Sequence, residues 1–145
     1  MLILSSKFVN PNDDLYRYAD RIQPEPGVDD IVCHGDPDSL LIEGLNGEVW
    51  HYSAEEAAEM IRNSREFRGK AIRLISCQTG AKDNGIAQQM ANILGVSVKA
   101  PTEIVNVDSE GKMFITNNDI LARLWNKGEK VKPTGKRKIF KPEKG

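Results

Sequence analysis

The sequence contains few cysteines and no long apolar run, and these two absences exclude several classes of protein. Two cysteines among 145 residues cannot form the disulfide framework of a small secreted domain. Cys33 and Cys77 could still pair, but both lie in strand-like segments, and two free thiols are the default inside a cell. No apolar run approaches the roughly 20 residues that span a bilayer, so no membrane partner is expected.

Signals for a bound metal and for export are also lacking. Neither Cys–His spacing resembles a zinc site, so no metal and no cofactor are expected. The segment 1–6 is too short for the apolar region of a signal peptide, and it has no basic lead-in. The chain is therefore expected to be cytoplasmic, or to be a piece of a larger protein that is delivered by other means.

The net charge of −1 hides an uneven distribution. From Lys127 to Gly145 there are eight Lys or Arg and two Glu, whereas the preceding residues hold twelve basic and nineteen acidic side chains. The same C-terminal stretch contains Pro133, Gly135 and Pro142, which favour an extended backbone. We therefore expect a single domain over residues 1–126 and a basic, loosely structured tail over residues 127–145.

Strand-like and helix-like segments alternate along the chain. Buried strands are predicted at 1–4, 30–33, 71–76 and 96–100, and helices at 14–22, 53–64, 84–94 and 118–125. Antiparallel hairpins are predicted at 40–52, around Asn46-Gly47, and at 104–116. Strands that alternate with helices imply right-handed crossovers and a parallel sheet with helices on both faces. The fold class is therefore α/β: a small, doubly wound, mainly parallel sheet in three layers, with one or two β-hairpins.

The ends of two predicted helices carry recognisable caps. Ser53 followed by Glu56 matches a capping box, in which each residue satisfies a backbone amide of the other. Gly95 follows the third helix and suits the left-handed conformation of a C-terminal cap. These two helices are therefore expected to begin and end close to the positions given above.

Two strand ends offer an imidazole and a thiol. His34 follows the second predicted strand and Cys77 follows the third. In open parallel sheets, ligands bind outside the carboxyl ends of the strands. A thiol is mostly protonated at neutral pH, and a neighbouring imidazole can remove its proton to give the nucleophilic thiolate. An acyl-transfer site also needs amides directed at a developing oxyanion, and Gly35 and the amide of Cys77 are the candidates.

Two other features near these residues have simpler interpretations. Asp36 and Asp38 could orient His34 or hold a metal, but Asp-Pro-Asp is more typical of a plain turn. His51 lies in a strand between Trp50 and Tyr52, and we expect it to be solvated or to serve in packing. Neither feature is therefore assigned to the catalytic set.

The segments 32–36 (Val-Cys-His-Gly-Asp) and 74–80 (Leu-Ile-Ser-Cys-Gln-Thr-Gly) resemble the His-Gly and Cys strand ends of the caspase-like cysteine peptidases. That group includes caspases, gingipains, separase and the self-cleaving domains of large bacterial toxins. The wider pattern, over residues 28–116, is similar to C-terminal modules of bacterial polymorphic toxins. The resemblance implies a caspase-like fold in which His34 is the general base, Cys77 the nucleophile and Gly35 an oxyanion donor.

The resemblance also implies a biological setting. The chain would be a peptidase or related thiol acyl-transferase that serves as an effector or processing module of a bacterial toxin. It would act in the cytoplasm of the producing or target cell, or be secreted within a larger toxin. Its partner would be a protein substrate or another protein, such as an immunity protein.

Two alternative hypotheses stay open at this point. A catalytically silent domain of the same fold would bind a protein partner. A toxin directed at nucleic acid would use the basic tail, with His34 and the nearby aspartates as its acid–base set. The tail contains one aromatic residue, Phe140, so base stacking has little support and nucleic acid is the less favoured partner. A reactive Cys77 would distinguish the peptidase from both alternatives.

Overall fold

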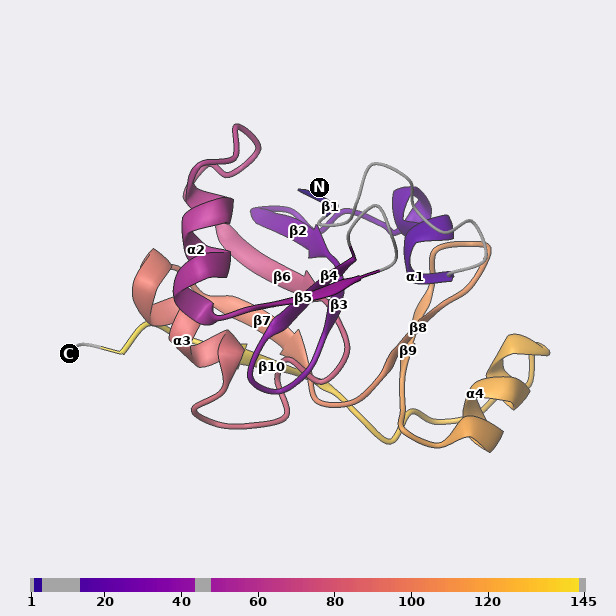
Figure 1. Ribbon diagram of the computed structural model, residues 1–145. Coiled ribbons are helices and arrows are strands. Elements are labelled where there is room, and N and C mark those ends of the chain that lie inside the picture. Colours follow the sequence, from indigo (N-terminus) through magenta and orange to yellow (C-terminus); the bar gives the residue numbers. More distant parts are fainter. Residues whose placement is uncertain (1, 4–13, 44–47, 144–145) are drawn as a thin grey trace.

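A five-stranded sheet forms the centre of the computed structural model, which describes residues 2–3, 14–43 and 48–143 (Figure 1). The strand order is β1-β2-β6-β7-β10. The first four strands are parallel, and β10 runs antiparallel to β7. The strands are β1 (Leu2–Ile3), β2 (Val28–Val32), β6 (Ala71–Ile75), β7 (Val98–Pro101) and β10 (Arg137–Phe140). The mainly parallel α/β fold predicted from the sequence is confirmed.

Two small antiparallel sheets accompany the central one. The first contains β3 (His34–Gly35), β4 (Leu40–Glu43) and β5 (Val49–Tyr52), and the second contains β8 (Val105–Val107) and β9 (Met113–Ile115). Both predicted hairpins are therefore present, and the Asn46-Gly47 turn lies outside the described residues. The short strand β3 was not predicted, and it pairs with β4 so that His34 lies opposite Leu41.

Two helices cover the first face of the sheet, α2 (Ala54–Arg62) and α3 (Ile86–Leu94), which lie next to each other in Figure 1. The capping box of α2 is present, since the Glu56 amide donates to Ser53 Oγ and the Ser53 amide donates to Glu56 Oε1. Gly95 ends α3 with a φ of 70°, in the left-handed region. The apolar faces of both helices pack on β2, β6 and β7. The buried residues at this interface include Ile31, Cys33, Ala57, Ile61, Leu74, Met90, Val98 and Phe140.

The second face of the sheet is covered differently. The short helix α1 (Asp14–Arg17), the 3-10 helix η1 (Ala19–Arg21) and the β8–β9 hairpin form a second apolar cluster with Val32 and Ile75. The helix α4 (Asp119–Asn126) joins the hairpin through Trp125, whose ring stacks on Phe114 at 5.2 Å. The predicted helix at 14–22 is thus divided into two short turns, and among the described helices none is long and apolar enough to cross a membrane.

A buried ion pair lies on the second face and joins the central residues of β2 and β6. Arg73 Nε donates to Asp30 Oδ1 at 2.6 Å and Arg73 Nη2 to Asp30 Oδ2 at 2.7 Å. Both side chains are 8% exposed, so each ion depends on its partner for the interactions it has lost with water.

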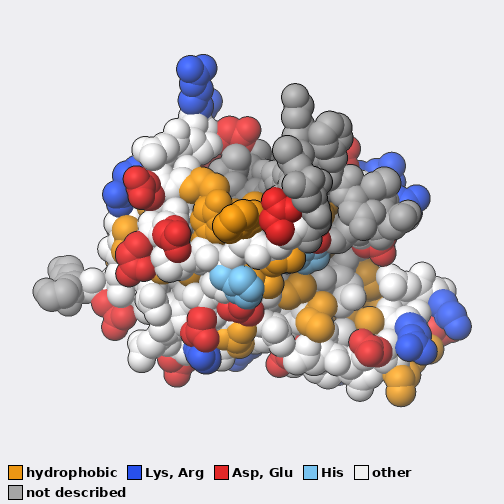
Figure 2. Space-filling model, in the orientation of Figure 1, with side chains coloured by type: hydrophobic (Ala, Val, Ile, Leu, Met, Phe, Trp, Pro, Cys, Tyr) orange, Lys and Arg blue, Asp and Glu red, His pale blue; other side chains and the backbone are white. Residues whose placement is uncertain are grey.

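The expectation of a loosely structured tail over 127–145 is wrong for its central part. Residues 137–140 form β10, the edge strand of the main sheet, and Phe140 is only 4% exposed within the first cluster. The preceding residues are also held by the body, since Gly135 donates its amide to the Ile115 carbonyl at 2.9 Å. Two of the basic side chains are not freely solvated. Lys138 forms an ion pair with Asp83 at 2.8 Å, and Arg137 is partly buried. In the view of Figure 2, most Lys and Arg side chains lie toward the margins of the surface.

Candidate functional site

The register of β2 and β6 brings His34 next to Cys77. Val32 pairs with Ile75, and the Cys33 amide donates to the Ile75 carbonyl at 3.3 Å. This register, continued beyond the ends of both strands, sets His34 beside Cys77. Because side chains alternate between the faces of a sheet, both residues are directed to the face of Val32 and Ile75. Cys77 follows His34 in the sequence by the same number of residues as Ile75 follows Val32, so the pairing of the strands itself places the two residues side by side.

His34 and Cys77 line one cleft at the carboxyl edge of the sheet. Both residues are half-buried. The remaining walls come from the start of α1, from the β8 strand with the residue before it, and from the end of α4. These walls contain Asp14, Leu15, Ile104, Val105, Asn106, Val107 and Asn126. The structure therefore brings the two residues together, and their catalytic roles stay a prediction.

Gly35 packs directly against the segment that carries Cys77. A Cβ atom at position 35 would lie 2.6 Å from Thr79 Cγ2 and 3.1 Å from the Cys77 carbonyl oxygen, so only glycine fits there without a shift. The Asp36 amide donates to the Ser39 carbonyl at 3.0 Å, and the alternation of antiparallel pairs then directs the Gly35 amide away from β4. The predicted oxyanion donor Gly35 therefore lies beside Cys77, at the same edge of the sheet.

The turn after β6 is fixed by buried contacts. Thr79 is fully buried, and its hydroxyl donates to the Ser76 carbonyl at 3.0 Å. Gln78 has a φ of 62°, in the left-handed region, and its amide donates to the Glu103 carbonyl at 2.9 Å. Such backbone conformations persist only where the surroundings hold them, and they are frequent at functional sites. The thiol thus sits on a turn whose shape is set by its neighbours.

The Tyr16 ring packs against the His34 ring on the second face of the sheet. The two rings meet edge to face with centroids 5.2 Å apart, and Tyr16 is only 6% exposed. Sequence reasoning missed both Tyr16 and Asp14, because the segment of α1 carries no motif. A Tyr in an amphipathic stretch is in most proteins a packing residue, so only the three-dimensional arrangement identifies it as a neighbour of the imidazole.

The two cysteines occupy opposite environments. Both are free thiols, and Cys33 is fully buried in the first cluster while Cys77 reaches the cleft on the other face. Burial raises the pKa of the Cys33 thiol to about 12. Cys33 is therefore an inert thiol in the folded protein, and it provides an internal comparison for the chemistry of Cys77.

Asp36 and Asp38 lie in the turn after β3, and their side chains make contacts that stabilise this turn. Asp36 Oδ1 accepts hydrogen bonds from the amides of Asp38 at 2.8 Å and Ser39 at 2.7 Å, and Asp38 binds Lys82 at 2.8 Å. Burial opposes the ionisation of Asp36, but the hydrogen bonds from Asp38 and Ser39 outweigh it and lower the pKa of the Asp36 carboxyl. The interpretation of 36–38 as a plain turn is confirmed.

His51 is a solvated residue, as expected. Its side chain is 66% exposed, and Nδ1 lies 3.4 Å from the Ser39 hydroxyl and 3.7 Å from Asp36 Oδ2. It does not line the cleft of Cys77. Within the described residues, no group of three or more His, Cys, Asp or Glu side chains could hold a metal ion.

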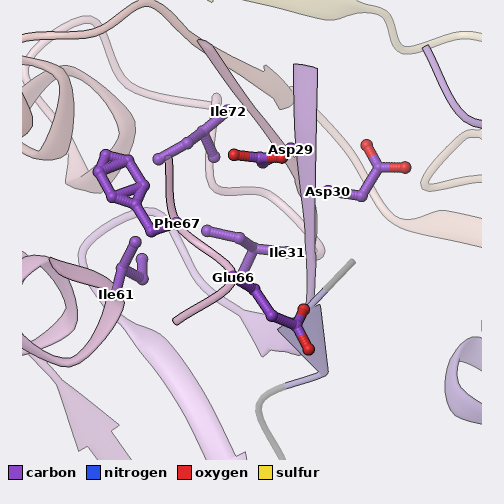
Figure 3. A pocket seen from close by; sticks show the side chains of 7 residues that line it. All are labelled: Asp29, Asp30, Ile31, Ile61, Glu66, Phe67 and Ile72. Carbon is purple, nitrogen blue, oxygen red and sulfur yellow. The ribbon is translucent and has the colours of Figure 1, made fainter. Parts of the chain in front are cut away.

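A second hollow lies near the amino end of β2 and is lined by apolar side chains and by the three acidic residues Asp29, Asp30 and Glu66 (Figure 3). Ile61, Phe67 and Ile72 face into it, whereas Asp30 points to the other side of β2, where it binds Arg73. Neither a thiol nor an imidazole is among the residues that line this hollow. The cleft of His34 and Cys77 is therefore the candidate site.

No curated protein and no solved structure matches the chain. One family model matches residues 4–115, a stretch that covers most of the chain and includes both His34 and Cys77. The chain therefore belongs to the family described as Domain of unknown function (DUF8616).

Proposed function

We propose that this chain is a caspase-like cysteine peptidase or a related thiol acyl-transferase, with Cys77 as the nucleophile and His34 as the general base. The observation that supports this proposal most is the shared cleft, in which paired strands carry a half-buried thiol and an imidazole on one face of the sheet. Cys33 lies just as close to the strand end, yet it is buried on the other face, so the arrangement is specific to Cys77.

The proposed reaction begins with a proton transfer. The His34 imidazole takes the proton of the Cys77 thiol, and the thiolate attacks the carbonyl carbon of a peptide bond. The amides of Gly35 and Cys77 donate to the oxyanion that develops on the carbonyl oxygen. The C–N bond then breaks, the amine leaves with the proton held by His34, and a thioester remains on Cys77.

The second half of the reaction distinguishes the two enzyme classes. In a peptidase, His34 removes a proton from water, whose oxygen attacks the thioester and releases the carboxylic acid. In an acyl-transferase, an amine takes the place of that water and a new amide forms. In both cases the thiol of Cys77 is regenerated with the proton returned by His34.

Protein is a better supported substrate than nucleic acid. The nucleic-acid alternative depends on a basic tail that is free to meet phosphates, but Lys138 binds Asp83 and β10 is part of the sheet. The similarity of residues 28–116 to modules of bacterial polymorphic toxins supports a role as an effector or processing module. We propose that role together with the activity.

The test is cleavage of a diverse peptide mixture, with mass-spectrometric detection of the acylated protein. Wild type is expected to cut peptides and to carry the acyl group on Cys77. Cys77→Ala is expected to abolish cleavage, and His34→Ala to slow it by at least about 100-fold. Cys33→Ala is the matched control and should retain activity. Cleavage that survives Cys77→Ala would contradict the proposal, as would a folded wild type that neither cleaves nor becomes acylated.

A further inference from the structure

Apart from His34 and Cys77, the cleft beside the thiol has one charged side chain in the part of its walls that the structure describes. Among the described residues that line it, Asp14 is the one carboxylate, and none is Lys or Arg. The other wall residues are apolar or neutral, with Leu15, Ile104, Val105 and Val107 supplying the apolar surface. An aliphatic stem that ends in a positive charge matches such a wall, since the stem packs on apolar groups while its end meets the carboxylate.

Asp14 is held in place relative to the imidazole. It begins α1, and its carbonyl accepts a hydrogen bond from the Tyr18 amide at 3.2 Å. The next two residues, Leu15 and Tyr16, are buried, and the Tyr16 ring contacts His34. The exposed side chain of Asp14 therefore lies on a helical turn that contacts the His34 ring through Tyr16.

The neighbouring surface extends the same charge sign. Asn126 lines the Cys77 cleft and also an adjacent, third hollow, whose walls contain the carboxylates of Asp108, Glu110 and Glu129. The one Lys or Arg in those walls is Lys112, and its Nζ lies 3.1 Å from Glu110 Oε2. Carboxylates thus outnumber Lys and Arg among the described residues in the walls on this side of the cleft, an arrangement that suits cationic groups.

We infer that the site acts on peptides with Lys or Arg at the residue that supplies the attacked carbonyl, and that Asp14 is the residue that selects this side chain. This inference rests on the proposed thiol chemistry, and it adds the class of substrate. An ammonium or guanidinium group would form a charge-assisted hydrogen bond with the Asp14 carboxylate, while a neutral or acidic side chain would not.

The first experiment compares three peptides that differ only in having Lys, Gln or Glu before the scissile bond. Wild type is expected to prefer Lys over Gln by about tenfold in kcat/KM, which corresponds to one hydrogen bond to a charged group. Asp14→Asn should remove most of that preference, and Asp14→Lys should reverse it toward Glu. Asp20→Asn, a change of another exposed acidic residue on η1, is the matched control and should keep the preference. Equal use of Lys and Gln by wild type would overturn the inference.

The second experiment measures the charge preference without any peptide cleavage. Cys77 is modified at low ionic strength by a cationic aminoethyl and by an anionic sulfonatoethyl methanethiosulfonate, and the ratio of the two rates is taken. Asp14→Asn is expected to lower that ratio by about fivefold, as the loss of one nearby charge in a mostly aqueous cleft predicts. Asp20→Asn, the matched control, should leave the ratio of the two rates equal to that of wild type within experimental error.

The two experiments separate the inference from the proposed function. A ratio that falls in Asp14→Asn while no peptide is cut would support a cation-selective cleft and refute the peptidase. A ratio that stays the same in Asp14→Asn would overturn the role of Asp14, even if Cys77 cleaves peptides.

Discussion

The strongest test of the fold is a pair of substitutions on β10. Phe140 and Ile139 are neighbours on this edge strand, and they face opposite sides of the sheet. Phe140 is 4% exposed and packs in the first cluster with α3 and β7, whereas Ile139 is 59% exposed. Phe140 is therefore the side chain by which the basic C-terminal segment takes part in the hydrophobic core.

The expected cost of Phe140→Ala follows from this burial. Truncation of a buried Phe to Ala costs about 3–5 kcal/mol, and an edge strand can relax, so we expect about 3 kcal/mol. For a chain of 145 residues this corresponds to a drop in Tm of about 10 °C. Ile139→Ala removes a mostly solvated side chain from the same strand, so its effect on the free energy of unfolding should be under about 0.5 kcal/mol.

The assay is urea unfolding followed by circular dichroism, with thermal unfolding as a second measurement. An unchanged m-value would show that the midpoint shift reports stability rather than a change in the denatured state. Equal effects of the two substitutions, or a Phe140→Ala protein as stable as wild type, would refute the docking of β10 on the core.

Three further predictions concern the site and the core. Gly35→Ala should lower both stability and the rate of Cys77 alkylation, because its Cβ would lie 2.6 Å from Thr79 Cγ2; normal alkylation in a folded variant would contradict the close packing. Arg73→Met should cost about 3–5 kcal/mol because it leaves Asp30 buried without its partner, whereas Lys82→Met, at an exposed pair, should cost under about 1 kcal/mol in the same urea titration. The raised pKa of Cys33, about 12, means that the unfolded chain loses this proton at a lower pH than the folded protein. The free energy of unfolding should therefore fall between about pH 9 and pH 12, and Cys33 contributes up to about 1.4 kcal/mol per pH unit to this fall. In Cys33→Ala the free energy of unfolding should fall less steeply over the same pH range.

Much of the fold could be predicted because the local signals agree with the tertiary structure. The capping box at Ser53, the C-terminal cap at Gly95 and the apolar strands of the main sheet each depend on a short stretch of sequence. The elements that were missed depend on distant partners. β10 has two basic residues among four and follows a Pro- and Gly-containing segment, and it becomes a strand because β7 offers an unpaired edge and the core accepts Phe140.

The candidate site could be predicted only in part for the same reason. His34 and Cys77 are visible in the sequence because each directly follows an apolar strand, and the topology of a parallel sheet then brings strand ends together. The residues that surround them come from α1, β8 and α4, which no motif connects to those strands. Tyr16 and Asp14 therefore required the three-dimensional structure.

The measurement that tests the central claim most directly is the rate of Cys77 alkylation by iodoacetamide as a function of pH. Wild type and His34→Ala are compared between about pH 5 and pH 9, with each labelled cysteine identified by peptide mass. If His34 takes the proton of Cys77, wild type should react at neutral pH at least about tenfold faster than His34→Ala. Cys33 should stay unlabelled in both proteins, because it is fully buried. Equal rates for Cys77 in wild type and in a folded His34→Ala protein would contradict the dyad.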